Sequence, residues 1–373
     1  MTAPKRKRLV VKVGTNTLTG GEDHLARPAM LGIVRQIARL VREGHEVALV
    51  SSGAIVAGRQ ALDVSGNGKS ASARIPFKQV LAAVGQAKLM QMWDELFSSE
   101  QMIVAQTLLT RGDLADRQGY LNARNTLLAL LERQVIPIVN ENDVVATEEI
   151  KIGDNDNLSA LVANLIDADL LVLLTDQLGL YTADPRRHAS ATLIAEVPAI
   201  TDEIVALAAG AGTARGTGGM QTKLQAARLA TESGVTVLVA GGKTDNILIS
   251  AVKGDAIGTR FPSNRTRMES RKRWIVAGLT AKAAAQIDAG AAAALGRGRS
   301  LLPAGVVSVK GRFDRGDSVN IVGPDGKAVG CGVANYSSAD LERIKGCRSP
   351  EITQILGYNF GDEVIHRNNV VML

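Results

Sequence analysis

Cysteine and histidine are scarce in this 373-residue chain. The two cysteines, Cys331 and Cys347, are too few for a disulfide framework or a thiolate zinc site, so we expect a reducing compartment, the cytoplasm. The four histidines, at positions 24, 45, 188 and 366, do not have the spacing of metal ligands. The composition therefore excludes the disulfide-rich secreted class, and we assign no metal ligands.

Long apolar runs are also missing, so we expect no membrane-spanning segment. The chain starts with a basic cluster at residues 5–8 and continues into the apolar run Leu9–Val13, which superficially resembles a signal peptide. The run is too short for one and contains Lys12. We interpret the basic cluster as a solvated tail.

Two familiar nucleotide-binding motifs are absent. Gly66–Ser70 ends like a P-loop, but Asp63 stands where the first glycine belongs and no apolar strand leads into it. No G-x-G-x-x-G follows the first apolar run. These motifs therefore do not supply a phosphate site here.

What the chain does contain, over residues 1–260, is an alternation of short apolar runs and longer amphipathic stretches. Continuous Val/Ile/Leu runs joined by helices predict an α/β fold with a mostly parallel sheet covered on both faces. The expected strands are Leu9–Val13, Val47–Val50, Ile103–Leu109, Val135–Val139, Leu170–Leu174 and Val235–Ala240, and the expected helices include Met30–Glu43, Phe77–Phe97, Leu121–Gln134 and Leu158–Ile166.

A basic stretch at residues 263–273 predicts a boundary between a first domain, residues 1–262, and a second, residues 274–373. Lys and Arg balance Asp and Glu before it, 27 against 27, and exceed them from residue 263 onward, 16 against 10. This excess positive charge would suit an anionic partner for the second domain. We expect this domain to be small and β-rich, with strands at Gly305–Phe313, Asp317–Val322 and Lys327–Val333 and an alanine-rich helix at Ala281–Leu295.

Small and polar residues follow five of the six apolar runs. Ligands of open parallel sheets bind beyond the carboxyl ends of the strands, so these residues predict a site. They are Gly14-Thr15-Asn16, Ser51-Ser52-Gly53-Ala54, Asn140-Glu141-Asn142-Asp143, Thr175-Asp176 and Gly241-Gly242.

Two lysines stand next to glycine-rich turns. Lys12 lies inside the first run and needs an anionic partner, while Gly14 allows backbone amides to approach a phosphate. Lys223 ends the glycine-rich segment 210–223 and falls in the first turn of a predicted helix, where free amides bind anions. For Lys12 the alternative is an edge lysine whose ammonium reaches solvent, and for segment 210–223 a surface loop before a capped helix.

An acidic, amide-rich cluster, Gly153–Asn157, opens another helix. Helix capping explains one or two of these residues but not four in succession. Asp154 or Asp156 is suited to orient lysines, and Asn155 to hold a polar substrate.

Taken in order, these segments resemble the glutamate 5-kinases of the amino acid kinase family. The resemblance covers residues 9–260 and includes the segment Gly179–Pro185. It implies an open α/β/α sandwich. From about Trp274 the chain resembles the PUA domain, a small β-barrel best known in RNA-modifying enzymes.

The resemblance implies phosphoryl transfer from ATP to the side-chain carboxylate of L-glutamate in a homo-oligomer that proline inhibits, in the first step of proline biosynthesis. Lys12 is implied to contact the transferred phosphate, with Lys223 and Asp156 as its catalytic companions. ATP is implied to bind at Thr175, Asp176, Thr217, Gly218, Gly219, Met220, Gln221, Thr222 and Lys223, and glutamate at Ser52, Asp143 and Asn155. We expect Mg²⁺ to be carried mainly by the nucleotide.

Two alternatives stay open. One is a kinase for another small acid such as N-acetylglutamate, which has no ammonium group and would not need Asp143. The other is an RNA-binding protein acting through its basic tail, although such a protein would not need the phosphate-binding segments. The tail is poor in the aromatic residues on which bases stack.

Overall fold

The computed structural model describes residues 6–64, 75–146, 155–209, 219–263 and 279–372. The chain divides into two compact units, residues 1–114 with 123–266 and residues 115–122 with 267–373. Residues 115–122 thus group with the second unit, although they lie within the predicted first domain. Residues 264–273 of the predicted linker lie outside the described residues, so the domain boundaries stay predictions.

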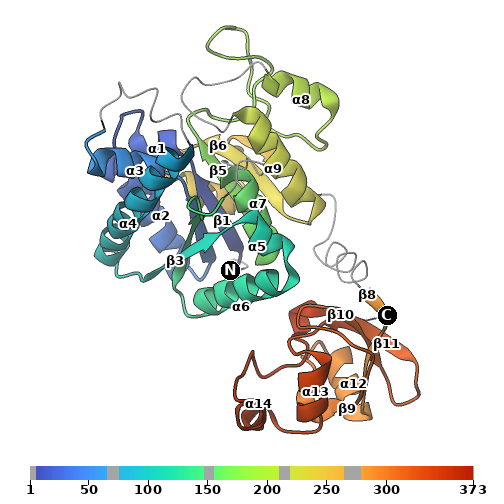
Figure 1. The fold of residues 1–373 in the computed structure, drawn as a ribbon. Coiled ribbons are helices and arrows are strands. Elements are labelled where there is room, and N and C mark those ends of the chain that lie inside the picture. Colours follow the sequence, from blue (N-terminus) through green and yellow to red (C-terminus); the bar gives the residue numbers. More distant parts are fainter. Residues whose placement is uncertain (1–5, 65–74, 147–154, 210–218, 264–278, 373) are drawn as a thin grey trace. The chain divides into compact units, whose positions relative to one another are not determined.

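The first unit contains a seven-stranded sheet in the order β3-β4-β2-β1-β5-β6-β7 (Figure 1). The first six strands in the chain are parallel, and the last, β7, is antiparallel to β6. The mostly parallel sheet predicted from the apolar runs is confirmed. The strands are β1 (Arg8–Val13), β2 (Glu46–Ser51), β3 (Val104–Leu109), β4 (Ile136–Glu141), β5 (Leu170–Thr175), β6 (Thr236–Gly241) and β7 (Thr259–Phe261).

Helices cover both faces of this sheet. On one face, Leu9, Val11 and Val13 pack in a core with α2 and α4. On the other, α7 packs against β1 and β5, and α9 lies beside α7 over β6 (Figure 1). The helices up to residue 266 are α1 (Thr15–Thr19), α2 (Arg27–Arg42), α3 (Ala54–Ala61), α4 (Ile75–Ser99), α5 (Arg111–Ala115), α6 (Arg117–Glu132), α7 (Asn155–Leu165), α8 (Asp202–Ala209), α9 (Met220–Glu232) and α10 (Ile247–Lys253).

The strand order reverses at β1, which has β2 on one side and β5 on the other. Val13 pairs with Ser51 and with Leu174, so these three strands end at one level. The residues that follow them therefore lie along a single edge. A crevice at such a reversal is the usual ligand site of open α/β sheets.

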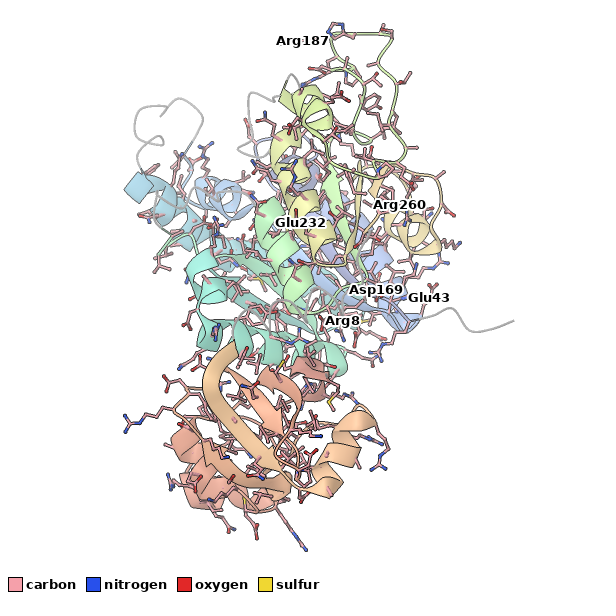
Figure 2. The ribbon with its side chains drawn as sticks, turned by 90° about the vertical axis from the view of Figure 1, so that its right-hand side faces the viewer. Arg8, Glu43, Asp169, Arg187, Glu232 and Arg260 are labelled. Atoms are coloured by element: carbon pink, nitrogen blue, oxygen red, sulfur yellow. The ribbon has the colours of Figure 1, made fainter. Side chains whose placement is uncertain are left out.

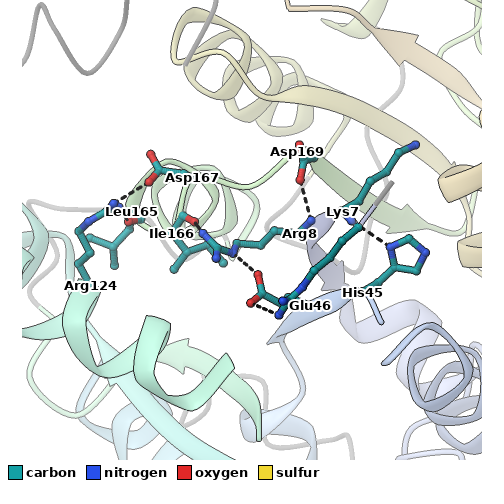
Figure 3. A network of polar contacts seen from close by, with 10 residues as sticks. Lys7, Arg8, His45, Glu46, Arg124, Leu165, Ile166, Asp167 and Asp169 are labelled. Carbon is teal, nitrogen blue, oxygen red and sulfur yellow. Dashed lines mark hydrogen bonds and ion pairs between the residues drawn. The ribbon is translucent and has the colours of Figure 1, made fainter. Parts of the chain in front are cut away.

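Two arginines hold the carboxyl end of α7, at the opposite edge of the sheet. Arg8 donates to the carbonyl oxygen of Ile166, and Arg124 of α6 donates to that of Leu165 (Figure 3). Carbonyl groups at a helix end lack partners within the helix and carry partial negative charge. The arginines therefore fix the end of α7 that lies away from the predicted site.

Carboxylates neutralise these arginines, so the prediction of a solvated basic tail is wrong for Arg8, which belongs to β1. Arg8 Nε lies 2.7 Å from Glu46 Oε2, and its backbone amide donates to Asp169 Oδ2 at 2.7 Å. Arg124, which is buried, pairs with Asp167 at 2.6 Å. In Figure 2 the labelled Arg8 and Asp169 lie close together, and Arg187, after β5, lies at the far end of the unit. Arg6 also pairs with Glu46, at 2.6 Å, so three arginines face three carboxylates at this end of α7, as expected of a structural contact.

Two glycines allow α3 and α4 to cross at backbone distance. A Cβ atom built on Gly85 would lie 1.8 Å from the carbonyl oxygen of Ala54, and one on Gly58 would lie 1.9 Å from that of Leu81. Neither position has room for a methyl group. The first turn of α3 and the middle of α4 are therefore held together without side chains between them.

We expect Gly85→Ala to lower the free energy of unfolding by about 2–3 kcal/mol, because the added methyl group must push the two helices apart. Gly32→Ala is the matched control. Gly32 lies in α2, and a Cβ atom there would meet open space. This control should raise stability by about 0.5–1 kcal/mol, as alanine does within helices. Urea unfolding of both variants tests the pair, and a neutral Gly85→Ala would contradict the close crossing.

The second unit contains a five-stranded sheet in the order β12-β11-β10-β8-β9. The three predicted strands are confirmed, and the small β-rich second domain with them. The strands are β8 (Leu279–Ile287), β9 (Val306–Lys310), β10 (Ser318–Val322), β11 (Ala328–Val333) and β12 (Val370–Met372), with helices α12 (Ala289–Gly296), α13 (Ser338–Ile344) and α14 (Ile352–Leu356) and 3-10 turns at Pro303–Gly305, Ser349–Glu351 and Arg367–Asn369.

The predicted helix Ala281–Leu295 is wrong in its first half. Residues up to Ile287 belong to β8, and the helix α12 begins at Ala289. Ala283, Ala285 and Ile287 are buried, whereas residues 284 and 286 between them are partly exposed, which is the two-residue period of a strand. Pairing with β9 and β10 therefore overrides the helical preference of alanine.

Within the described residues, no helix is both long and apolar enough to cross a bilayer.

Candidate active site

Asp156 lies between two lysine side chains at the carboxyl edge of the sheet. It belongs to the first turn of α7 and is fully buried. Lys12 Nζ of β1 lies 2.6 Å from Asp156 Oδ1, and Lys223 Nζ of α9 lies 3.0 Å from Asp156 Oδ2. Three elements thus meet at one carboxylate.

The charges of this cluster do not cancel, because one carboxylate faces two ammonium groups. Burial on its own raises the pKa of Asp156, but the charges and hydrogen bonds of Lys12 and Lys223 hold that pKa well below its usual range. Asp156 is therefore ionised, and the cluster keeps a net charge of about +1. Such a cluster suits an anion such as a phosphate.

The first turn of α9 carries five of the residues expected at ATP. Gly219 stands at the N-cap, in extended conformation, and the helix starts at Met220. Thr222 Oγ1 lies 3.0 Å from Asp156 Oδ2 and 2.8 Å from the carbonyl oxygen of Gly219, and its one hydrogen serves one of them at a time. Backbone amides in the first turn of a helix lack partners within the helix, so this turn is suited to bind an anion. Gln221 is exposed; Thr217 and Gly218 lie outside the described residues.

Asn155, the neighbour of Asp156, turns toward β2 and β4. Its side-chain amide donates to Ser52 Oγ at 3.0 Å and to Asn140 Oδ1 at 2.9 Å, with the carbonyl oxygen of Ser51 at 3.3 Å. The structure thus brings together Ser52 and Asn155, two of the three residues expected at glutamate. Asn155 and Asp156 are consecutive residues of α7, so the residues around Asn155 lie next to the lysine cluster around Asp156.

Sequence reasoning did not single out Gln86 and Trp93, which lie behind this group on α4. Gln86 Oε1 accepts from Asn140 Nδ2 at 2.8 Å, and Trp93 Nε1 donates to Ser51 Oγ at 2.9 Å. Gln86 continues a buried stripe of α4 that also contains Ala82, Leu89 and Trp93. The sequence did contain a signal for Gln86, because a glutamine stands there among apolar residues that repeat with helical spacing.

Asp143 follows β4 and is half buried. Burial raises the pKa of its carboxyl group, and no hydrogen bond or ion pair of this side chain is found among the described residues. A cationic group brought by a ligand would favour the charged form of this carboxyl group. In the acidic, amide-rich cluster Gly153–Asn157, which follows Asp143 in the chain, Gly153 and Asp154 lie outside the described residues.

Thr175 and Asp176 close β5 at the same edge. Thr175 Oγ1 donates to Asp176 Oδ1 at 3.0 Å, and Asn16 Nδ2 of α1 lies 3.5 Å from Asp176 Oδ2. Among the described residues, we find no hydrogen bond or ion pair that joins Asp143 or Asp176 to the lysine cluster. The predicted site residues at this edge therefore form two hydrogen-bonded groups, one around Asp156 and one around Asn155. Asp143 and Asp176 lie apart from both groups.

The described residues include no group of three or more His, Cys, Asp or Glu side chains suited to a metal ion. The cationic cluster and the first turn of α9 fit a nucleotide phosphate better than a bare cation.

The family model described as the amino acid kinase family matches residues 7–241, most of the chain. The chain belongs to the amino acid kinase family. A second model, for the PUA domain, matches residues 284–356 after this amino acid kinase region.

Similar curated proteins cover nearly the whole length. The chain is 53% identical over 365 residues to the glutamate 5-kinase of Herpetosiphon aurantiacus, with 98% of each chain covered. It is 53% identical over 371 residues to that of Dehalococcoides mccartyi, again with 98% of each covered. With that of Deinococcus radiodurans it shares 50% identity over 367 residues, 98% of this chain and 100% of the relative. This amino acid kinase is thus similar in both of its parts to enzymes of one name.

Proposed function

We propose that the chain transfers the γ-phosphoryl group of ATP to the γ-carboxylate of L-glutamate. The product is L-glutamyl 5-phosphate, the first intermediate of proline biosynthesis. The observation that supports this best is the pair of lysines, Lys12 and Lys223, held on Asp156 at the carboxyl edge of the sheet. The full-length similarity to enzymes named glutamate 5-kinase supports the same reaction.

The chemistry needs positive charge more than it needs a base. A glutamate side chain, with a pKa of about 4.3, is already ionised at neutral pH. One of its oxygens forms the new bond to the γ-phosphorus while the bond from that phosphorus to the bridging oxygen breaks, and ADP leaves. An anion must approach a polyanion in this step. Lys12 and Lys223 are the groups suited to balance the charge that moves from the γ-phosphate to ADP.

The same cluster suits ATP as phosphoryl donor. The first turn of α9, Gly219–Lys223, supplies backbone amides beside an ammonium group, and Thr175 and Asp176 stand at the same edge. We propose that Mg²⁺ comes with the nucleotide and that, when bound, it neutralises phosphate charge.

Asp143 favours glutamate over an N-acylated acid. Its half-buried carboxyl group, whose pKa burial raises, has no cationic partner among the described residues. The substrate ammonium would be that partner. N-acetylglutamate has no such charge to offer.

One assay tests the proposal. The purified chain is incubated with ATP, Mg²⁺ and hydroxylamine, which traps an acyl phosphate as a hydroxamate. Glutamate, N-acetylglutamate and aspartate are compared, and glutamate should give the highest kcat/KM. Higher kcat/KM with N-acetylglutamate would select the alternative kinase, and no hydroxamate from any acid would refute carboxylate phosphorylation.

We also propose feedback inhibition by proline at a site that overlaps that of glutamate. Proline keeps an α-carboxylate and a charged nitrogen, so it can use Asp143. It should raise the apparent KM for glutamate and leave kcat nearly unchanged, and Asp143→Ala should weaken both glutamate and proline binding. Initial rates measured against glutamate at several fixed proline concentrations test whether the two sites overlap. A lower kcat at constant KM would indicate a separate proline site. Glu148 and Glu149, where we expect changes to weaken inhibition more than catalysis, lie outside the described residues.

Three further proposals rest on the sequence. We propose a homo-oligomer, a cytoplasmic location and RNA binding by the PUA domain. RNA binding through basic charge should weaken steeply as salt increases.

A further inference from the structure

Three side-chain amides form a hydrogen-bonded row behind the glutamate-binding residues. Asn155 Nδ2 donates to Asn140 Oδ1 at 2.9 Å, and Asn140 Nδ2 donates to Gln86 Oε1 at 2.8 Å. Asn140 is 2% exposed and Gln86 is 9% exposed. The row runs from the first turn of α7, across the end of β4, to the middle of α4.

A backbone group fixes the direction of this row. The amide N–H of Glu141 donates to Asn140 Oδ1 at 2.9 Å, and a backbone N–H cannot become an acceptor. Asn140 must therefore turn its oxygen toward Glu141 and Asn155 and its nitrogen toward Gln86. The Asn155 amide must in turn present its nitrogen to Asn140.

Both ends of the row are left unsatisfied. Asn155 Oδ1 and Gln86 Nε2 are buried and have no hydrogen-bond partner among the described residues. A buried polar atom without a partner is costly, and such atoms are often completed by a ligand or water. The acceptor end belongs to Asn155, whose nitrogen also contacts Ser52 Oγ and the carbonyl oxygen of Ser51, and both Asn155 and Ser52 are residues proposed to bind the substrate.

We propose that Gln86 is a positioning residue that acts through Asn140. It holds the Asn155 amide with its carbonyl oxygen free to accept a hydrogen bond from the substrate ammonium. Gln86 is suited to this task because its neighbour Gly85 meets the first turn of α3 at backbone distance, which fixes this part of α4. The inference rests on the proposed function, because it takes glutamate as the substrate.

The experiment compares two substitutions of nearly equal size. Gln86→Met removes the acceptor for Asn140 Nδ2, whereas Gln86→Glu keeps an oxygen in the same place. Gln86→Met should raise the KM for glutamate about tenfold, the effect of one hydrogen bond to a charged group. The KM for ATP and kcat should change less than twofold. Gln86→Glu should stay within about threefold of the wild-type KM.

Two further readouts separate positioning from general damage to the fold. In an Asn155→Ala background, Gln86→Met should add little, because both changes remove one interaction. Glutarate lacks the ammonium, so its inhibition constant against glutamate should be the same in Gln86→Met and in wild type.

Each opposite result overturns the inference. Equal increases in the KM values of ATP and glutamate would indicate general distortion, and additive effects of the Gln86 and Asn155 changes would show that they act independently. A parallel loss of glutarate binding would exclude the ammonium as the group concerned. Wild-type protein that forms no glutamyl hydroxamate would refute the proposed function and this inference together. Active wild-type protein whose Gln86→Met variant shows no selective increase in the KM for glutamate would refute this inference alone.

Discussion

Lys12→Ala and Lys223→Ala should each lower kcat by roughly 10²-fold or more, the scale of losing one transition-state contact. Both side chains lie within 3.0 Å of Asp156, where charge moves during the proposed transfer. Each variant leaves one lysine paired with Asp156, so the fold should be retained. Hydroxamate formation at saturating ATP and glutamate measures the loss.

Lys253→Ala is the control for these two variants. Lys253 is an exposed lysine in the last turn of α10, outside the proposed site. Its removal changes the net charge equally and should leave kcat unchanged. If Lys12→Ala or Lys223→Ala behaves like this control, the role proposed for that lysine is wrong.

Asp156→Asn should damage both stability and activity. It leaves two buried ammonium groups facing each other without a counter-charge, and removing one partner of a buried ion pair costs about 3–5 kcal/mol. We expect kcat to fall by roughly 10²-fold as the lysines move apart. Urea unfolding at pH 7 measures the stability, and an unchanged midpoint would contradict the role of Asp156 in holding Lys12 and Lys223.

The stability difference between wild type and Asp156→Asn should depend on pH. The folded-state pKa of Asp156 is held below its unfolded value, so its ionisation stabilises the fold above about pH 4. This contribution is lost as the pH falls toward the folded-state pKa, by about 1.4 kcal/mol per pH unit. The difference should therefore be constant from pH 5 to 7 and shrink below pH 4. A difference that stays the same at pH 3 would contradict the depressed pKa.

The lysine cluster was predictable in its members because chain order constrains a parallel sheet. Lys12 ends a strand, Asp156 opens a helix and Lys223 opens another, and all such positions meet at one edge. The same rule anticipated Ser52 near Asn155. What the sequence could not supply is the pairing, since Asp154 was as well suited as Asp156 to meet a lysine.

Gln86 and Gly85 could not be found by the same rule. They lie in the middle of α4, a 25-residue helix, and their importance depends on which face of it meets α3 and β4. That face is set by the crossing at Gly58 and Gly85, which are 27 residues apart, so no local sequence pattern contains this contact. The strand at residues 279–287 was missed for a related reason, because its partners are distant along the chain.

Helix α7 is held at both ends, by the two lysines at its amino end and by the two arginines at its carboxyl end, and this limits how its length can vary among related sequences. The helix has 11 residues and spans roughly 16 Å, with Asn155 and Asp156 at one end and the arginine-bound carbonyl groups at the other. Inserting or deleting one residue would turn one end by about 100° relative to the other. The Asp156 carboxylate would then leave the two lysines or the carbonyl groups would leave the arginines. Homologous sequences should therefore vary mainly at the partly exposed positions of α7 while keeping its length unchanged, so that alignments of this segment contain no gaps.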